Sequence, residues 1–565
     1  MAKVISIGNQ SFESIREKDN FYIDKTNFIR EWWDNDDTVT LITRPRRFGK
    51  TLNMSMLECF FSNKYKDRGD LFEGLEIWND EKYRKLQGTY PVIFLSFAEI
   101  KQNNYNDAVE KIKRIICEVC QQFDFLKNWD GLTEIEKKNI SNISYNMSDV
   151  MAQDLIKNMS NYLSRYYGKK VIILLDEYDT PMQEAYVNGY WEELVAFTRS
   201  LFNSTFKTNP YLERAIMTGI TRVSKESIFS DLNNLKVITV TSDEYSKCFG
   251  FTEDEVFAAL DEQGLSSEKE KVKLWYDGFT FGDEKDVYNP WSIINFLDEK
   301  KYKTYWADSS SNGLVNELIR TGSAEIKKTM ETLIAGGTVE KNIDEQIVFE
   351  QLKTNKDAVW SLLLASGYLR VETFRTEGRL NKKIYSLKLT NYEVEQMFGT
   401  MIGRWFGGAD VPYNEFINAM LNGDIESMNE YMNRVSRGVI SYFDTGKTPS
   451  DEEPERFYHG LVLGLMVEQV DNYILNSNRE SGYGRYDIML EPIDKTNEKY
   501  PGIVIEFKVI NPRKENSLEE TVAAALKQIE EKNYDAELVK RGVKEENIHH
   551  YGFAFRGKEV LIDGR

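Results

Sequence analysis

The stretch Val39-Thr-Leu-Ile-Thr-Arg-Pro-Arg-Arg-Phe-Gly-Lys-Thr51 decides the fold of the amino-terminal half of the chain. Its first five residues are β-branched or apolar and predict a strand, and the apolar-rich residues that follow, up to Phe61, predict a helix. Between a strand and a helix, backbone N–H groups and the helix amino terminus surround a phosphate. Lys50 would reach the β and γ phosphates, and the Thr51 hydroxyl would bind Mg²⁺. The expected nucleotide contacts of this loop are Arg46, Arg47, Phe48, Gly49, Lys50 and Thr51.

The loop departs from the general phosphate-binding pattern at its first position. The pattern GxxxxGK[ST] has glycine there, and this chain has Arg44. Without that glycine the start of the loop must adopt ordinary dihedral angles, which the rigid ring of Pro45 favours.

A second motif supports a nucleotide site. The run Val171-Ile-Ile-Leu-Leu-Asp-Glu177 predicts a fully buried central strand that ends in two carboxylates. Asp176 would hold Mg²⁺ through water, and Glu177 would orient and deprotonate the attacking water. The alternative interpretation is an acidic loop, Asp176 to Asp179, that caps a helix.

A third strand, Ala215–Thr218, is followed by Thr218-Gly-Ile-Thr-Arg222. Thr218 would sense the γ phosphate and Arg222 would stabilise the transferred charge, although a threonine at the end of a strand is commonplace. Two further apolar runs lie at 92–97 and 237–240. Because helix-length amphipathic stretches separate these strands, the sequence predicts an α/β fold with a mainly parallel sheet.

The middle of the chain lacks the alternation of strands and helices that precedes it. From Thr252 to Glu299 the pattern is helical and predicts a lid that opens with the capping box Thr252-Glu-Asp-Glu255. A helix at 358–367 followed by a hairpin up to Leu389 suggests a winged helix, which either binds DNA or is structural. The polar segment 444–454 predicts a linker. The expected domains are therefore an ATPase core (1–250), the lid (251–310), a helical and winged-helix-like region (311–443) and a carboxy-terminal domain (455–565).

The carboxy-terminal domain carries a second candidate site. In the strand that contains Glu506-Phe-Lys508, the two charged side chains share one face because strand residues alternate. Asp487, on the preceding strand, would share a divalent metal with Glu506, and Lys508 would orient or deprotonate a water that attacks a phosphodiester. The alternative is a half-exposed strand whose Glu and Lys face solvent.

Both halves resemble known families. The segments 22–26, 44–51, 175–181, 218–222 and 275–278 make residues 5–300 similar to the AAA-ATPase-like family of bacterial proteins, whose phosphate loop also lacks the first glycine. The carboxy-terminal segment resembles the PD-(D/E)xK nuclease domain often attached to it. That resemblance implies a P-loop ATPase joined to an α/β nuclease-like domain, catalytic roles for Asp487, Glu506 and Lys508, and substrate contacts from Gln528 and Tyr534. It also implies a glutamate on the first helix of that domain, for which Glu455 and Glu468 are equal candidates.

Bulk composition limits the chemistry further. The three histidines, His459, His549 and His550, all lie in the last quarter of the chain, so the ATPase half must bind metal through oxygen ligands, hence Mg²⁺ or Mn²⁺. His459 is expected to be a packing residue, and Cys117-x-x-Cys120 lacks the second ligand pair of a zinc site. Four cysteines, no signal-peptide core and no apolar run of membrane-spanning length favour the cytoplasm.

The two candidate sites favour an ATP-dependent nuclease over a nucleotide-dependent scaffold. The leading hypothesis is an ATP-binding and ATP-hydrolysing protein coupled to a metal-dependent nuclease that cleaves DNA, in a setting such as mobile-element or phage defence. Because the net charge is -19, DNA must be held at a confined site. The alternative is a nucleotide-dependent switch or scaffold with an inactive nuclease-like domain. An arginine supplied by a neighbouring subunit would require a homo-oligomer, with Arg46, Arg47 and Arg222 as candidates.

Overall fold

The computed structural model describes residues 3–565 except for these segments: 223–227, 230–231, 308–314, 316–317, 320–323, 335, 345–357, 379–381, 407–412, 440–471, 478–479, 482–483, 486, 498, 512–513 and 557–558. Contacts divide the chain into two units. The amino-terminal unit comprises Met1–Ser311 and Glu340–Glu393, and the carboxy-terminal unit comprises Asn312–Val339 and Val394–Arg565. The division into four domains that the sequence suggests stays a prediction.

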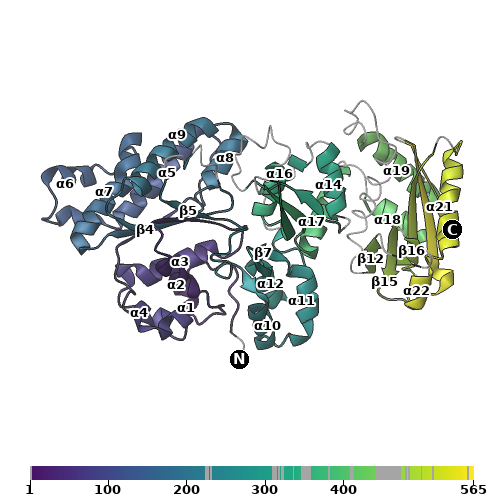
Figure 1. Cartoon of the computed structure of the whole chain (residues 1–565), viewed down its shortest axis with the longest axis horizontal. Helices are drawn as coiled ribbons and strands as arrows, with labels where there is room; N and C mark the ends of the chain where they lie inside the picture. Colours follow the sequence, from purple (N-terminus) through teal and green to yellow (C-terminus); the bar gives the residue numbers. More distant parts are fainter. Residues whose placement is uncertain are drawn as a thin grey trace. The chain divides into compact units, whose positions relative to one another are not determined.

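A five-stranded, all-parallel sheet forms the centre of the amino-terminal unit, as the sequence predicts (Figure 1). Its strands stand in the order β2-β3-β4-β1-β5. Strand β3 is buried along its whole length, which explains its uninterrupted apolar sequence. The strands are β1 (Val39–Thr43), β2 (Val92–Ser96), β3 (Val171–Asp176), β4 (Leu212–Gly219) and β5 (Leu235–Ile238).

Helices cover both faces of this sheet. Figure 1 shows α1 to α4 on one face and α5, α7 and α9 on the other. Sequence caps set several of the ends: the Ser148 side chain accepts a hydrogen bond from the N–H of Met151 at the start of α7, and Gly168, with φ 67°, ends it. The helices are α1 (Phe12–Glu17), α2 (Asn27–Asn35), α3 (Lys50–Phe61), α4 (Glu81–Arg84), α5 (Tyr105–Gln121), α6 (Glu134–Ser141), α7 (Asp149–Tyr167), α8 (Thr180–Asn188) and α9 (Trp191–Phe202).

The lid contains helices and also a small sheet. Helices α10 (Glu253–Glu262), α11 (Lys269–Tyr276) and α12 (Pro290–Glu299) are present, and the predicted capping box is confirmed between Thr252 and Glu255. Three antiparallel strands in the order β6-β8-β7 accompany them: β6 (Phe251–Thr252), β7 (Phe279–Phe281) and β8 (Glu284–Tyr288). The sequence did not predict these strands, because β6 and β7 have only two and three residues and because β8 begins with three charged residues instead of an apolar run.

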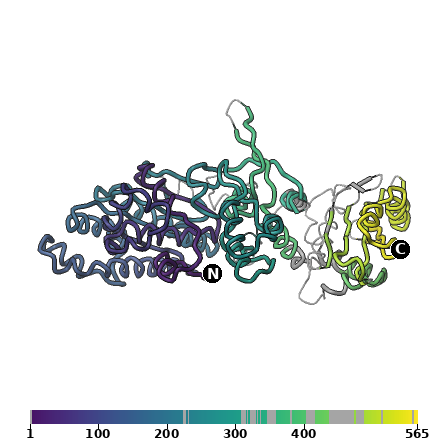
Figure 2. Tube along the Cα trace, turned by 90° about the horizontal axis from the view of Figure 1, so that it is seen from below, coloured from purple at the N-terminus to yellow at the C-terminus, as the bar shows by residue number. Residues whose placement is uncertain are grey.

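A helix and a hairpin follow the lid. Helix α16 (Ala358–Ala365) leads into β10 (Leu369–Glu377) and β11 (Lys382–Leu389), which pair antiparallel, and β9 (Val339–Lys341) completes a three-stranded sheet. Figure 2 traces this hairpin as a long arm. The outer half of β10 is exposed, from Thr373 to Glu377. The helix-then-hairpin order is as expected, and its identification as a winged helix stays a prediction.

The carboxy-terminal unit contains a mixed sheet in the order β12-β15-β16-β17-β18, in which only β16 and β17 run parallel. Residues of α18 and α19 bury one face of the sheet, and α21 and α22 bury the other. The elements are α14 (Ala324–Ile334), α17 (Tyr392–Phe406), α18 (Tyr413–Asn422), α19 (Ile425–Val439), β12 (Tyr473–Ser477), β13 (Glu480–Ser481), β14 (Gly484–Arg485), β15 (Ile488–Pro492), β16 (Gly502–Val509), α21 (Leu518–Lys532), α22 (Ala536–Lys540), β17 (Ile548–Arg556) and β18 (Glu559–Gly564).

Candidate active sites

The phosphate loop joins β1 to α3 and holds its lysine inside the loop. Gly49 has φ 78° and precedes the first residue of α3, a conformation in which a side chain is strained. Lys50 is buried, and its Nζ donates to the carbonyl oxygens of Arg44 (3.1 Å) and Pro45 (3.0 Å). The same Nζ lies 3.5 Å from Glu177 Oε1. Lys50 therefore binds oxygen atoms of the loop itself and of Glu177, and its predicted contact with phosphate stays a prediction.

Asp176 is the centre of the candidate magnesium site. It ends β3 and is fully buried, and its two carboxylate oxygens accept hydrogen bonds from Thr51 Oγ1 (2.8 Å) and Thr218 Oγ1 (2.6 Å). Burial, and then the charge of Glu177, raise the pKa of the Asp176 carboxyl, while both threonine hydroxyls counteract that rise. A hydroxyl and a carboxylate this close form an oxygen donor pair that fits Mg²⁺. The structure thus brings together three of the predicted residues, Thr51 from the start of α3 and Asp176 and Thr218 from the ends of β3 and β4.

Glu177 takes an unusual backbone conformation for a glutamate. Its φ is 54°, in the left-handed region, and its N–H donates to Thr218 Oγ1 at 3.4 Å. The side chain is 19% exposed and reaches Lys50. Strained backbone of this kind clusters at functional sites, and here it turns the carboxylate toward the phosphate loop.

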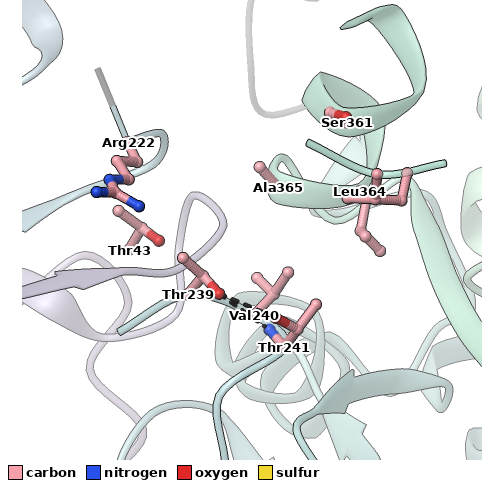
Figure 3. Close-up of a pocket in the computed structure, with 9 residues that line it drawn as sticks. Thr43, Arg222, Thr239, Val240, Thr241, Ser361, Leu364 and Ala365 are labelled. Atoms are coloured by element: carbon pink, nitrogen blue, oxygen red, sulfur yellow. Dashed lines mark hydrogen bonds between the residues drawn. The ribbon is translucent and has the colours of Figure 1, made fainter. Parts of the chain in front are cut away.

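Arg222 is one of the residues that line a small cavity beside the end of β1. Its side chain is close to Thr43, the last residue of β1, and the cavity is also lined by Thr239, Ser361 and Ala365 (Figure 3). Within the described part of the chain, its Nε is buried and has no hydrogen-bond partner. The Thr218 hydroxyl, by contrast, donates to Asp176 Oδ1 at 2.6 Å, and its predicted contact with the γ phosphate stays a prediction.

Residues 46 to 48 contact the lid, Arg46 through its backbone carbonyl and Arg47 and Phe48 through their side chains. The Arg46 carbonyl accepts from Asn289 Nδ2 (3.3 Å) and Trp306 Nε1 (3.0 Å). Arg47, with φ 65°, places its guanidinium 4.2 Å from the ring centroid of Trp291. The buried ring of Phe48 packs on two lid phenylalanines, Phe279 and Phe281. These contacts anchor the loop, and their predicted role in nucleotide binding stays a prediction.

Arg44 occupies the position of the missing glycine and points into the protein. It is fully buried, and its guanidinium donates to the carbonyl oxygens of Thr43 (3.0 Å), Thr239 (2.7 Å), Glu244 (3.4 Å) and Tyr245 (3.3 Å). The guanidinium also lies 4.5 Å from the ring centroid of Phe281. Burial lowers the pKa of Arg44 to about 10, so the group remains charged at neutral pH. Sequence reasoning noted only the missing glycine and did not foresee these contacts.

The nuclease-like site is organised on one face of β16. Glu506 is buried, and Lys508, two residues further, lies 4.0 Å from it on the same face. Gln528 on α21 connects them, because its Oε1 accepts from Lys508 Nζ at 2.7 Å and its Nε2 donates to Glu506 Oε1. Phe507 packs on the opposite side of the sheet against Phe553, as strand alternation predicts.

Asp487 lies immediately before β15, the neighbour of β16. Its Oδ2 accepts from the N–H of Phe507 at 2.8 Å, which fixes the carboxylate beside Glu506. Two carboxylates on adjacent strands fit a divalent cation. Within the residues that the structure describes, no group of three or more His, Cys, Asp or Glu side chains is arranged to hold a metal ion. The predicted first-helix candidates Glu455 and Glu468, the linker 444–454 and His459 lie outside the described residues.

Tyr534 reaches this site by a turn that the sequence did not predict. Helix α21 ends at Lys532, and the next residue, Asn533, has φ 52°. In an uninterrupted helix, residues six apart lie about 240° apart and cannot meet. The left-handed Asn533 instead turns the chain back, so that Gln528 Nε2 donates to the Tyr534 hydroxyl at 3.2 Å. Burial, and more weakly Glu506 and Asp487, raise the pKa of that hydroxyl.

The remaining candidate residues lie elsewhere. Cys117 and Cys120 are buried within α5. His549 Nδ1 contacts the Tyr551 hydroxyl at 3.1 Å, and His550 Nε2 contacts Asp535 Oδ1 at 2.7 Å. Among the helices in the described ranges, none has both the length and the apolar character that a bilayer crossing requires.

Comparisons with known proteins agree with this geometry. Residues 6–229 match the family model described as a predicted AAA-ATPase, and residues 453–564 match the model of the PD-(D/E)XK nuclease superfamily. The chain is also 25% identical over 396 residues to an "Uncharacterized protein in vnfD 5'region" of Azotobacter chroococcum mcd 1, covering 70% of this chain and 68% of that protein. Such domains generally use nucleotides and divalent metal ions. The chain therefore contains an AAA-ATPase-like domain over residues 6–229 and a PD-(D/E)XK nuclease superfamily domain over residues 453–564.

Proposed function

We propose that this protein binds and hydrolyses ATP in its amino-terminal unit and uses that activity to drive or gate cleavage of DNA phosphodiester bonds in its carboxy-terminal unit. The observation that carries the ATPase half is the convergence on Asp176 of the Thr51 and Thr218 hydroxyls, with Lys50 and Glu177 3.5 Å apart beside it. An acidic loop that merely caps a helix would not bring these strand ends together. We infer a cytoplasmic role in defence against mobile elements or phage, in which cleavage of foreign DNA is controlled by nucleotide.

In the ATPase half each residue has a distinct task. Lys50 would exchange its loop carbonyl partners for β and γ phosphate oxygens, and Arg222 would stabilise negative charge on the transferred group. Glu177 would orient the attacking water and accept its proton. Mg²⁺, held by the Thr51 hydroxyl and the Asp176 carboxylate, would neutralise phosphate charge. The raised pKa of Asp176 implies that this binding weakens on acidification, because only the carboxylate form is a ligand.

In the nuclease half the hydrogen-bonded row on β16 and α21 supports the proposal. Lys508 has Gln528 and Glu506 as neighbours and is partly exposed, so it can orient a water for attack on a phosphodiester. Asp487 and Glu506 would hold Mg²⁺ or Mn²⁺, which would neutralise the charge on the phosphate oxygens. Gln528 and Tyr534 would contact the substrate. A half-exposed strand whose Glu and Lys only face solvent would not bury Glu506.

The ATPase half is tested by Mg²⁺-dependent release of phosphate from ATP. Glu177→Gln keeps the size of the side chain and removes the base, so we expect the hydrolysis rate to fall by about 100-fold or more. The matched control is Glu118→Gln, which changes an exposed glutamate on α5 and should leave the rate unchanged. A wild-type protein that releases no phosphate, or an unaffected Glu177→Gln, contradicts this half.

The nuclease half is tested on supercoiled plasmid with Mg²⁺ or Mn²⁺. Lys508→Ala should lower the nicking rate by about 100-fold. Lys527→Ala is the matched control, because Lys527 is an exposed lysine on α21 directly before Gln528. Absence of metal-dependent nicking by the wild type, or equal nicking by Lys508→Ala, would favour the alternative of a nucleotide-dependent scaffold.

A further inference from the structure

Asp179 lies at the start of α8, and its carboxylate accepts hydrogen bonds from residues 220 and 221, which follow β4. As the residue before Thr180 it is in the capping position, yet its side chain makes no capping hydrogen bond to its own helix. Its Oδ2 instead accepts from the N–H of Ile220 (3.0 Å), the N–H of Thr221 (2.8 Å) and Thr221 Oγ1 (3.0 Å). The side chain is fully buried. A buried carboxylate is tolerated only when donors of this kind compensate it.

Tyr178 and Gly219 also help to fix the segment at the end of β4. The Tyr178 hydroxyl donates to the carbonyl oxygen of Thr221 at 2.8 Å, so Tyr178 and Asp179 together bind both backbone polar groups of Thr221. Gly219 provides the space, since a Cβ on it would lie 2.6 Å from Asp179 Oδ1 and 2.7 Å from the Tyr178 ring. The consecutive residues 178 and 179 therefore fix the conformation of residues 219–221.

The segment held in this way connects directly to the nucleotide site. The Gly219 carbonyl accepts from the N–H of Arg44, the first residue of the phosphate loop, at 3.0 Å. At its other end is Arg222, whose side chain lies beside Thr43 (Figure 3). Gln183 adds a second connection, because its Nε2 donates to Asp179 Oδ2 at 3.1 Å and its Oε1 lies 3.5 Å from Arg46 Nη2.

We propose that Asp179 is a positioning residue for ATP hydrolysis: by holding residues 220 and 221 it sets the location of Arg222 relative to the phosphate loop. This proposal rests on the ATPase function proposed above. Asp179 touches neither nucleotide nor metal in this account and acts through Arg222. Burial and the nearby Glu177 raise the pKa of the Asp179 carboxyl, and the N–H groups of Thr221 and Ile220 counteract that rise.

The structure specifies which substitutions separate positioning from general destabilisation. Asp179→Ala removes the acceptor of all these hydrogen bonds. Asp179→Asn keeps one amide oxygen, and all the donors converge on a single oxygen, Oδ2, so the asparagine can preserve the arrangement. Thr221→Val removes the hydroxyl bond and leaves the N–H bond in place.

The test is a double-mutant cycle in steady-state ATP hydrolysis. We expect Asp179→Ala to lower kcat by about 10- to 100-fold with KM within about threefold of wild type, because a misplaced charge-stabilising group affects the chemical step. Arg222→Ala should lower kcat similarly, and the double variant should be no slower than the slower single variant, since both changes remove the same interaction. Asp179→Asn should recover kcat to within about threefold of wild type, and Thr221→Val should lie between.

Three results would contradict the proposal, and they differ from failure of the ATPase function. Effects of Asp179→Ala and Arg222→Ala that multiply in the double variant would show that Asp179 acts independently of Arg222. The same conclusion follows if KM rises while kcat stays constant, or if Thr221→Val and Asp179→Asn are both as slow as Asp179→Ala while remaining folded by thermal denaturation. Wild-type protein that hydrolyses no ATP would instead contradict the proposed function itself. If Asp179→Ala does not fold, Thr221→Val paired with Arg222→Ala runs the same cycle.

Discussion

At the scale of single residues, Arg44 shows how a departure from a general motif is accommodated. A glycine at the start of a phosphate loop has no side chain to place. Here the side chain turns inward and donates to carbonyl oxygens that are 195 to 201 residues away in the sequence, in the segment after β5. The phosphate loop is thereby attached to that segment by a buried guanidinium, and the phenyl ring of Phe281 covers it.

This arrangement makes a prediction opposite to what the general motif suggests. Arg44→Gly, which restores the glycine of the pattern, should lower the free energy of unfolding of the amino-terminal unit by about 3 kcal/mol, since buried carbonyl oxygens lose their donors and a cavity remains. Arg47→Ala, which changes an exposed arginine of the same loop, should cost about 1 kcal/mol or less. Urea unfolding followed by far-UV circular dichroism measures both. An Arg44→Gly variant as stable as wild type would show that these contacts do not stabilise the unit.

Residues within local motifs were predictable from the sequence, and long-range contacts were not. Lys50, Thr51 and Asp176 follow from strand and helix patterns because parallel strands place their carboxyl ends at one edge of the sheet. The hydrogen bonds of Arg44, and those between Asp179 and Thr221, depend on how segments that are distant in the sequence pack together. Composition and periodicity do not determine that packing. The same holds for Gln528, whose bridge between Lys508 and Glu506 depends on how α21 packs on β16.

At the scale of elements, strands made of apolar runs were predictable, and very short or charged strands were not. The core strand β3 stands out because burial on both faces leaves six consecutive apolar or acidic residues with no alternation. The lid sheet was missed because its strands are short and because Phe279 and Phe281 resemble turn-flanking aromatics. The turn at the end of α21 was not predicted, since a single left-handed asparagine leaves no periodic signal.

The lid contains a carboxyl group, that of Asp277, whose environment makes the stability of the lid depend on pH. Asp277 follows α11, and burial, then the charge and hydrogen bond of Asp286, raise the pKa of Asp277 to about 7, while Lys273 opposes that rise. The folded lid therefore keeps a proton that the unfolded chain releases near its ordinary pKa of 3.8. Stability from this group is full below about pH 3.8 and is lost progressively as the pH rises from there to about 7.

Asp277→Asn tests this linkage. The amide cannot ionise, so we expect the variant to gain melting temperature relative to wild type at pH 8 and to gain clearly less at pH 5. Thermal denaturation at the two pH values gives the comparison, and Asp254→Asn, at an exposed aspartate on α10, provides the control. An equal difference between Asp277→Asn and wild type at both pH values would argue that Asp277 keeps an ordinary pKa.

At the scale of the whole molecule, two domains with separate chemistry share one acidic chain. The order of an ATPase core followed by a nuclease domain was readable from the sequence, because each carries its own strand-end motif. With a net charge of -19, the protein cannot attract DNA over a broad surface, so we expect DNA contact to depend on the metal-binding carboxylates and on local cations such as Lys508. In the proposed function, ATP hydrolysis in the amino-terminal unit controls DNA cleavage in the carboxy-terminal unit.

Plasmid nicking by Lys50→Ala tests that claim most directly. Wild type, Lys50→Ala and Lys508→Ala are incubated with supercoiled DNA and Mg²⁺, with and without ATP, and phosphate release is followed in the same samples. We predict that ATP changes the nicking rate of wild type, that Lys50→Ala loses both phosphate release and this response to ATP, and that Lys508→Ala releases phosphate without nicking. Nicking by Lys50→Ala that equals the wild-type rate with and without ATP would contradict the coupling.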